Sequence, residues 1–143
     1  METLDFSIYQ DKKLVPAKEI VQLQAGKGKE ANSSIYIASA IFEFVEGVIW
    51  ERHREYGNSR KSKIHDSDWK RINIGFNDAI TELEQAQNPK DLTTVLQVST
   101  HQEVFSLEDV FAKKAELQTL FKELITWIES KSSSPYIMVL KNI

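Results

Sequence analysis

Two carboxylates and a histidine stand at helical spacing in the first half of the chain and form the first candidate for chemistry. Glu43 and Glu46 are three residues apart, and His53 follows two helical turns later, so a helix would place them on one face. Carboxylate-bridged di-metal bundles need a Glu-x-x-His pair on a second helix, and no histidine here has a glutamate three residues before it. We therefore predict no metal site. The face runs from Ser39 through Trp50 and is interpreted as a polar seam.

Arg60 and His65 form the second candidate, with four residues between them. Histidine can act as a general acid or base on a ribose hydroxyl, and arginine can stabilise the charge that develops on a phosphate. The pair resembles the R-x4-6-H motif of HEPN-type ribonucleases, which are helical proteins. The resemblance covers six residues, and here the motif occupies a predicted polar loop, Gly57 to His65, and not the start of a helix. It implies a ribonuclease with Arg60 and His65 as catalytic residues, which we keep as an alternative.

The segment from Arg52 to Arg71, called the basic segment below, is positively charged within an acidic chain. It holds seven basic and three acidic residues, a local charge of +4, whereas the whole chain carries −3. Basic side chains neutralise phosphates, and aromatic side chains such as Tyr56 stack on bases. The alternative nucleic-acid site consists of Arg52, Arg54, Arg60, Lys61, Lys63, Trp69 and Arg71. The competing interpretation is a solvated helix end whose charges compensate the helix dipole.

The remainder of the chain carries −7, because the basic segment accounts for +4 of the total of −3. An acidic surface can steer a basic partner and set its docking orientation. The sequence has no Gly-x-Ser-x-Gly motif, and the Gly-Lys-Gly-Lys at residues 26–29 lacks the spacing and the Ser or Thr of a phosphate loop.

These observations predict a non-enzymatic binding module that uses no cofactor. The preferred function is a protein–protein inhibitor, an immunity protein or antitoxin that neutralises a basic partner such as a toxin. The alternative is an RNA-binding protein or HEPN-like ribonuclease that uses the basic segment. A structural subunit of a homo-oligomer is a third alternative.

The apolar run from Ile35 to Trp50 predicts a helix over residues 33–56 around which the other elements pack. Ser33 or Ser34 can cap its start, and basic residues followed by Gly57 mark its end. Apolar side chains cover most of its circumference, as is typical of a central helix. A membrane span is not expected, because a span needs about 20 apolar residues and two glutamates interrupt this shorter run.

The other elements follow from periodicity. Alternation over residues 4–8 and the compact apolar run at 136–140 predict strands. Residues 16–24 fit either a short helix that begins at Pro16 or a strand at 19–23, and we prefer the strand. Apolar stripes predict helices that begin near Asp66 and at Ser106, with a short helix ending at Val95 between them. Gly75, inside the second long helix, predicts a close approach to the central helix near Gly47.

The predicted fold class is α+β: three long helices packed around the central helix 33–56, with a small sheet from N- and C-terminal strands. An all-α bundle is the alternative. The 143 residues predict one domain, 1–143. The chain has no cysteine, which excludes disulfides and thiolate sites, and its first residues lack the pattern of a secretion signal. We therefore expect a cytoplasmic protein.

Overall fold

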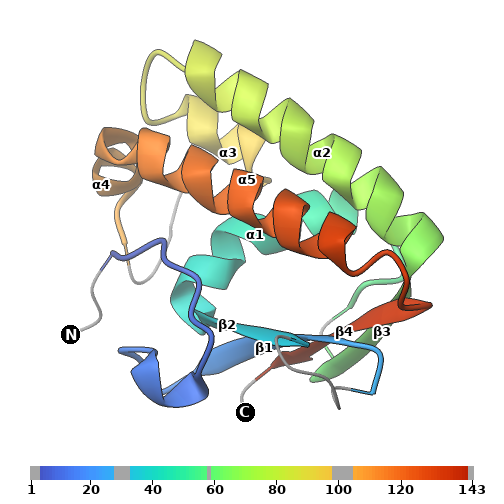
Figure 1. The fold of residues 1–143 in the computed structure, drawn as a ribbon. Helices are drawn as coiled ribbons and strands as arrows, with labels where there is room; N and C mark the ends of the chain where they lie inside the picture. Colours follow the sequence, from blue (N-terminus) through green and yellow to red (C-terminus); the bar gives the residue numbers. More distant parts are fainter. Residues whose placement is uncertain (1–3, 28–32, 58, 98–104, 142–143) are drawn as a thin grey trace.

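A computed structural model describes residues 4–27, 33–57, 59–97 and 105–141, and these form one antiparallel sheet with helices on one side (Figure 1). The strands lie in the order β2–β1–β4–β3. Their bounds are Ile20–Ala25 for β1, Ser34–Ala38 for β2, Lys61–His65 for β3 and Tyr136–Lys141 for β4. The helices are α1 (Ser39–Arg52), α2 (Asp66–Gln85), α3 (Asp91–Val95), α4 (Leu107–Ala112) and α5 (Lys114–Ser130), with a 3-10 turn η1 at Lys12–Leu14. The α+β class is confirmed, and the all-α alternative is wrong.

Strand register divides the sheet into two faces. Side chains of one parity point toward the helices and are nearly inaccessible to solvent: Val21, Leu23, Ile35, Ile37, Ile64, Ile137 and Val139. The residues between them lie on the opposite face, where most are exposed or half-buried. The described α-helices all lie on the first side, so we call the second side the open face (Figure 1).

The core lies between the sheet and the helices. α1 packs against β1, β2 and α2, and α2 in turn packs against α5. Seven of the 14 residues of α1 are buried, including Phe42 and Phe44, which are fully inaccessible. Phe76 of α2 meets Phe121 of α5 with ring centroids 5.3 Å apart. None of the described helices is long and apolar enough to cross a membrane.

The predicted helix 33–56 is wrong at both ends, and its last residues, 53–56, lie beyond the end of α1 at Arg52. Ser34–Ala38 is strand β2, and α1 begins at Ser39, so the predicted caps Ser33 and Ser34 do not act at a helix end. β2 pairs with β1 through a register that sets Ile37 opposite Val21. The apolar run is continuous because a buried strand is followed without a break by a buried helix, and hydrophobicity alone does not mark the junction.

The predicted polar loop Gly57 to His65 is also partly wrong, because its second half is strand β3. β3 is an edge strand in which Ile64 is buried, at 1% exposure, while Lys61 and Lys63 are exposed, so its sequence looks polar. The strand predicted over residues 4–8 is not formed, although Phe6 is buried against Phe44 with ring centroids 6.1 Å apart. In this region only Tyr9 pairs with the sheet, through a bridge to Tyr36.

Most of the remaining elements confirm the predictions. β1 overlaps the strand predicted at residues 19–23, β4 is the closing strand, α2 begins at Asp66, and α3 ends at Val95. Ser106 caps α4 by accepting a hydrogen bond from the Asp109 N–H, as its sequence predicts. The third long helix, however, is two helices, because the backbone at Lys113 leaves the helical conformation, with φ −110° and ψ 24°, between α4 and α5.

Candidate functional site

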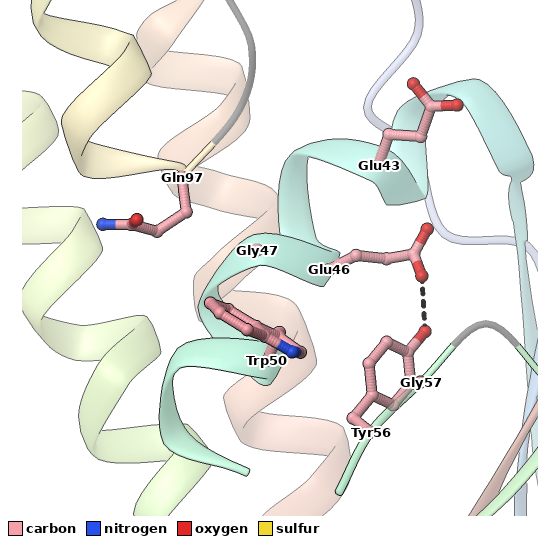
Figure 2. A pocket seen from close by; sticks show the side chains of 7 residues that line it. All are labelled: Glu43, Glu46, Gly47, Trp50, Tyr56, Gly57 and Gln97. Atoms are coloured by element: carbon pink, nitrogen blue, oxygen red, sulfur yellow. Dashed lines mark hydrogen bonds between the residues drawn. The ribbon is translucent and has the colours of Figure 1, made fainter. Parts of the chain in front are cut away.

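A cleft of about 390 Å³ lies beside α1 and brings together the acidic side chains that helical spacing predicted (Figure 2). It is lined by Glu43, Glu46, Gly47, Trp50, Tyr56, Gly57 and Gln97. The four residues from α1 recur at steps of three, one and three, so they form one stripe of the helix. The predicted polar seam of the central helix is therefore one wall of this cleft.

Glu46, Tyr56 and Lys141 form a closed cluster at this wall. The Tyr56 hydroxyl donates a hydrogen bond of 2.6 Å to Glu46 Oε2, and Lys141 Nζ lies 2.5 Å from the same oxygen. The Lys141 ammonium also lies 4.8 Å from the centre of the Tyr56 ring. The cluster joins α1, the segment after it and the end of β4, so it holds the cleft wall to the sheet.

The environment of Tyr56 fixes its protonation state. Burial raises the pKa of Tyr56 far above its ordinary value of 10.0, and the charge of Glu46 and the hydrogen bond to it raise it further. Tyr56 is 4% exposed. A tyrosine in this state keeps its proton and serves as a hydrogen-bond donor, so it does not act as a base. The cluster is therefore suited to positioning Glu46, which keeps one carboxylate oxygen fixed.

Trp50 gives the cleft an exposed aromatic surface. Its side chain is among the large hydrophobic groups left accessible, at 44% exposure. Figure 2 shows the Glu46 and Tyr56 side chains pointing toward one another, the Trp50 ring lying across α1, and the Gln97 side chain pointing away from Glu46 and Tyr56. The Arg54 guanidinium lies 3.8 Å from the centre of the Trp50 ring and donates a 3.2 Å hydrogen bond to Glu51. The ring thus already accommodates one guanidinium group.

His53, the third member of the predicted acidic and imidazole face, lies outside the cleft. Its Nδ1 is 3.8 Å from Asp68 Oδ2, and its side chain is 10% exposed. Arg71 approaches the other oxygen of Asp68 at 2.6 Å, so His53 belongs to an ion-pair group between α1 and α2. Among the residues that the structure describes, no three histidine, aspartate or glutamate side chains lie close enough to hold a metal ion.

The basic segment is not one surface. Arg52 pairs with Asp78 at 2.6 Å, Arg54 lies on Trp50, and Arg71 pairs with Asp68, so these three predicted phosphate-binding residues already have partners. The predicted stacking residues Trp69 and Tyr56 are 1% and 4% exposed, so neither can stack on a base. Trp69 instead donates a 3.4 Å hydrogen bond to the Ile137 carbonyl of β4. Arg54 and Arg71 are exposed but paired, and the exposed basic residues of the predicted set for which no ion pair is described are Arg60, Lys61 and Lys63.

The HEPN-like pair is not brought together. Arg60 precedes β3 and His65 ends it, so the extended chain separates their Cα atoms by about 16 Å. Since both groups must reach one phosphodiester, this geometry gives the resemblance no structural support.

Sequence reasoning missed Tyr56 as a cleft residue, and it missed Lys141 and Gln97 altogether. Lys141 carried a usable signal, because it continues the two-residue period of Ile137 and Val139 and therefore stands on the buried face of β4. A lysine at such a position needs an acidic partner, which is Glu46. Tyr56 and Gln97 reach the cleft only through the path of the chain after α1 and α3, for which the sequence carried no signal.

The raised pKa of Tyr56 predicts a loss of stability in alkali. Above pH 10 the unfolded chain releases the Tyr56 proton while the folded chain keeps it. The contribution of Tyr56 to the free energy of unfolding is therefore complete below pH 10 and is lost as the pH rises further. At pH 11 the loss amounts to about 1.4 kcal/mol. We expect the free energy of unfolding in urea to fall between pH 9 and pH 11 by about 1.4 kcal/mol more in the wild type than in Tyr56→Phe. Equal losses in the two proteins would contradict the assignment.

Comparison of the chain with protein-family models, with curated proteins and with solved structures found no match.

Proposed function

We propose that the protein is a non-enzymatic binding module whose cleft beside α1 receives a basic side chain from a partner protein. The observation that carries this proposal is the combination of Glu43 and Glu46 with the exposed ring of Trp50 along one helical stripe. Tryptophan and tyrosine are the residue types that contribute most to protein interfaces. A cationic group between a carboxylate and an indole ring gains both ion-pair and cation–π attraction.

The contact between Arg54 and Trp50 supports a guanidinium or ammonium ligand in particular. Arg54 already rests on the indole ring at 3.8 Å. A partner's arginine or lysine would use the same kind of contact from the cleft side, where the carboxylates lie. Tyr56 and Lys141 both hold Glu46 Oε2, and the Glu46 side chain keeps 27% of its surface exposed, so little side-chain freedom is lost when a ligand binds to that accessible part.

Acidic groups continue beyond the cleft. A neighbouring groove of about 210 Å³ between α1 and α2 shares Gln97 with the cleft and is lined by Glu51, Asp78 and Glu82, with Arg52 as its basic residue. The helical layer is acidic as a whole. α2 carries five acidic and two basic residues, α4 two acidic residues, and α5 three acidic and two basic residues, which gives −6 for the three helices. Such a field accelerates the approach of a basic partner.

The finer form of this proposal is an immunity-type inhibitor that acts in the cytoplasm on a basic toxin. Its support is the acidic helical layer together with a chain that contains no cysteine and so depends on no disulfide. A blocking protein of this kind needs a steering surface and one anchoring pocket, and it needs no catalytic group.

An arginine-rich decapeptide titrated by calorimetry at about 50 mM salt tests the proposal. We expect Trp50→Ala and Glu43→Gln each to weaken binding by about tenfold, because Trp50 supplies the cation–π contact and Glu43 is an acidic group of the cleft lining. The matched controls are Ile74→Ala, which removes another exposed apolar side chain, and Glu123→Gln, which removes an exposed carboxylate on α5. Both should bind as the wild type does. An equal loss in Glu123→Gln would reduce the interaction to general charge attraction and contradict a specific cleft.

A further inference from the structure

The open face of the sheet is a second surface with a charge opposite to that of the helical layer. Pairing register places two lysines and a histidine of β3, two tyrosines, and a group of amides and hydroxyls on it. Its members are Gln22, Gln24, Ser34, Tyr36, Lys61, Lys63, His65, Tyr136, Met138 and Leu140. Ile20 and Met138, on the same face, are buried, and its exposed residues are Lys61, Lys63 and His65 of β3. We infer that this open face binds single-stranded nucleic acid, a function beyond the proposed cleft.

The charges of this face are available to a ligand. Lys61 and Lys63 are exposed, and among the described residues neither forms an ion pair with an acidic side chain. Lys70 and Arg71 on α2, by contrast, pair with Asp66 and Asp68. The acidic helices lie across the sheet from this face (Figure 1). At about 0.1 M salt, charges more than roughly 10 Å apart are largely screened, so a ligand at the face meets mainly its lysines.

Two tyrosines supply stacking surfaces at the two ends of this face. Tyr36 on β2 lies opposite Gln22, which lies opposite Leu140 on β4, and Tyr136 stands four residues from Leu140. Strand spacing and rise then separate the two tyrosines by roughly 16 Å along a diagonal. Both rings are half-buried, so each keeps an accessible side. Aromatic rings on a sheet stack on bases of any sequence, whereas paired bases in a duplex are not available for such stacking.

Lys63 links the charged and aromatic parts. Its ammonium lies 4.2 Å from the centre of the Tyr136 ring. A phosphate that binds beside the ring can pair with the Lys63 ammonium, and the Tyr136 ring is then available to stack on a base. Between the tyrosines, the Gln22 amide donates 2.9 Å to Ser34 Oγ and lies 3.5 Å from the Tyr36 hydroxyl. These polar groups can exchange their mutual bonds for bonds to base edges or to sugar hydroxyls.

Lysines on an edge strand also have a purely protective use, because they discourage the pairing of exposed strands from two molecules. That use requires the lysines alone. It gives no role to Tyr36, Tyr136 or the amide groups, and it predicts association of the protein, and no loss of a ligand, when the lysines are removed. The two uses are therefore separable by experiment.

The test measures the anisotropy of fluorescein-labelled twelve-nucleotide oligo(dT) and oligo(U) at about 50 mM salt. We expect Lys61→Gln/Lys63→Gln to lose about tenfold in affinity and to reduce the slope of log affinity against log salt by about 1.4. Tyr36→Leu and Tyr136→Leu should each lose about tenfold with an unchanged slope, because stacking releases no counterions. Lys70→Gln/Arg71→Gln is the matched control, since it removes the same charge from α2 and should bind within twofold of the wild type.

Three results would overturn the inference. Absence of binding by the wild type at about 100 μM protein would do so directly, as would an equal loss in Lys70→Gln/Arg71→Gln. Retained affinity in both tyrosine variants, together with tight binding of heparin, would show ion exchange alone. Light scattering on Lys61→Gln/Lys63→Gln tests the protective use of the lysines. If this variant forms dimers or aggregates and the wild type binds no nucleic acid, the lysines serve only to prevent association. The exposed lysine variants keep the test valid even if a tyrosine variant folds poorly.

Discussion

Gly47→Ala should lower the free energy of unfolding by about 2 kcal/mol, whereas Gly75→Ala should leave it nearly unchanged, although both glycines lie inside helices. A Cβ at Gly47 would stand 2.2 Å from the Leu96 carbonyl oxygen and 2.8 Å from the Gln97 Cβ. The backbone there has little freedom to retreat, because Gln97 already adopts a φ of 55°, in the left-handed region. The clash therefore outweighs the gain of about 1 kcal/mol in helix propensity.

Gly75 meets softer neighbours. A Cβ there would lie 2.8 Å from Arg52 Cγ and 3.1 Å from Val48 Cγ1. The Arg52 side chain is 36% exposed and can swing aside, at the cost of its surface pair with Asp78. That cost is comparable to the propensity gain of about 1 kcal/mol, so the two cancel.

Urea unfolding of the two variants under the same conditions measures the difference. Gly47→Ala should also perturb the cleft, because Leu96 and Gln97 must move, and we expect the fluorescence of Trp50 to change with it. Equal stability changes at the two glycines would mean that Leu96 and Gln97 do not approach Gly47 as closely as these distances indicate. The pairing of Gly75 with Gly47 expected from the sequence is wrong in its detail: Gly75 faces Val48 and Arg52, and Gly47 faces the end of α3.

The cleft residues of α1 show which features of a site the sequence can predict. Glu43, Glu46 and Trp50 line one cleft because they lie within a true helix, where spacing alone fixes the face. His53 lies one residue beyond the end of α1, at φ −145°, so extrapolation of the helix failed there. Partners that arrive from other elements, such as Lys141 from β4, depend on tertiary placement and carry a weaker signal.

The main errors of the predicted fold lie at an edge strand of the sheet and at the junctions between elements. β3 has only one fully buried side chain, Ile64, because an edge strand is covered on one side and pairs along one edge, so its composition resembles a loop. Phe6 is buried without being in a strand, so alternation at residues 4–8 reflected burial more than backbone pairing. Where a helix has a strong apolar stripe, as α2 has, the spacing of its apolar residues suffices to predict it, although its N-cap residue, His65, makes no side-chain capping hydrogen bond.

The start of α1 is the junction with the largest consequence, and substitutions in β2 can test it. Ile35→Ala and Ile37→Ala should each cost about 3 kcal/mol, because both side chains are 0% exposed on the helix-facing side of the sheet. Tyr36→Ala, between them, should cost about 1 kcal/mol, since Tyr36 stands on the open face and loses mainly cross-strand contacts. The expected pattern is therefore large, small, large over three consecutive residues.

A helix through these residues predicts another pattern. Residues 35 and 37 of a helix are about 200° apart, so the two isoleucines would face opposite sides, and Tyr36 would lie midway between them. A central helix that is buried all round would then make all three substitutions costly, with Tyr36→Ala among the most severe because its side chain is the largest. Urea unfolding of the three variants decides between the two patterns. A costly Tyr36→Ala would return residues 34–38 to a helix and would remove the open face on which the nucleic-acid inference depends.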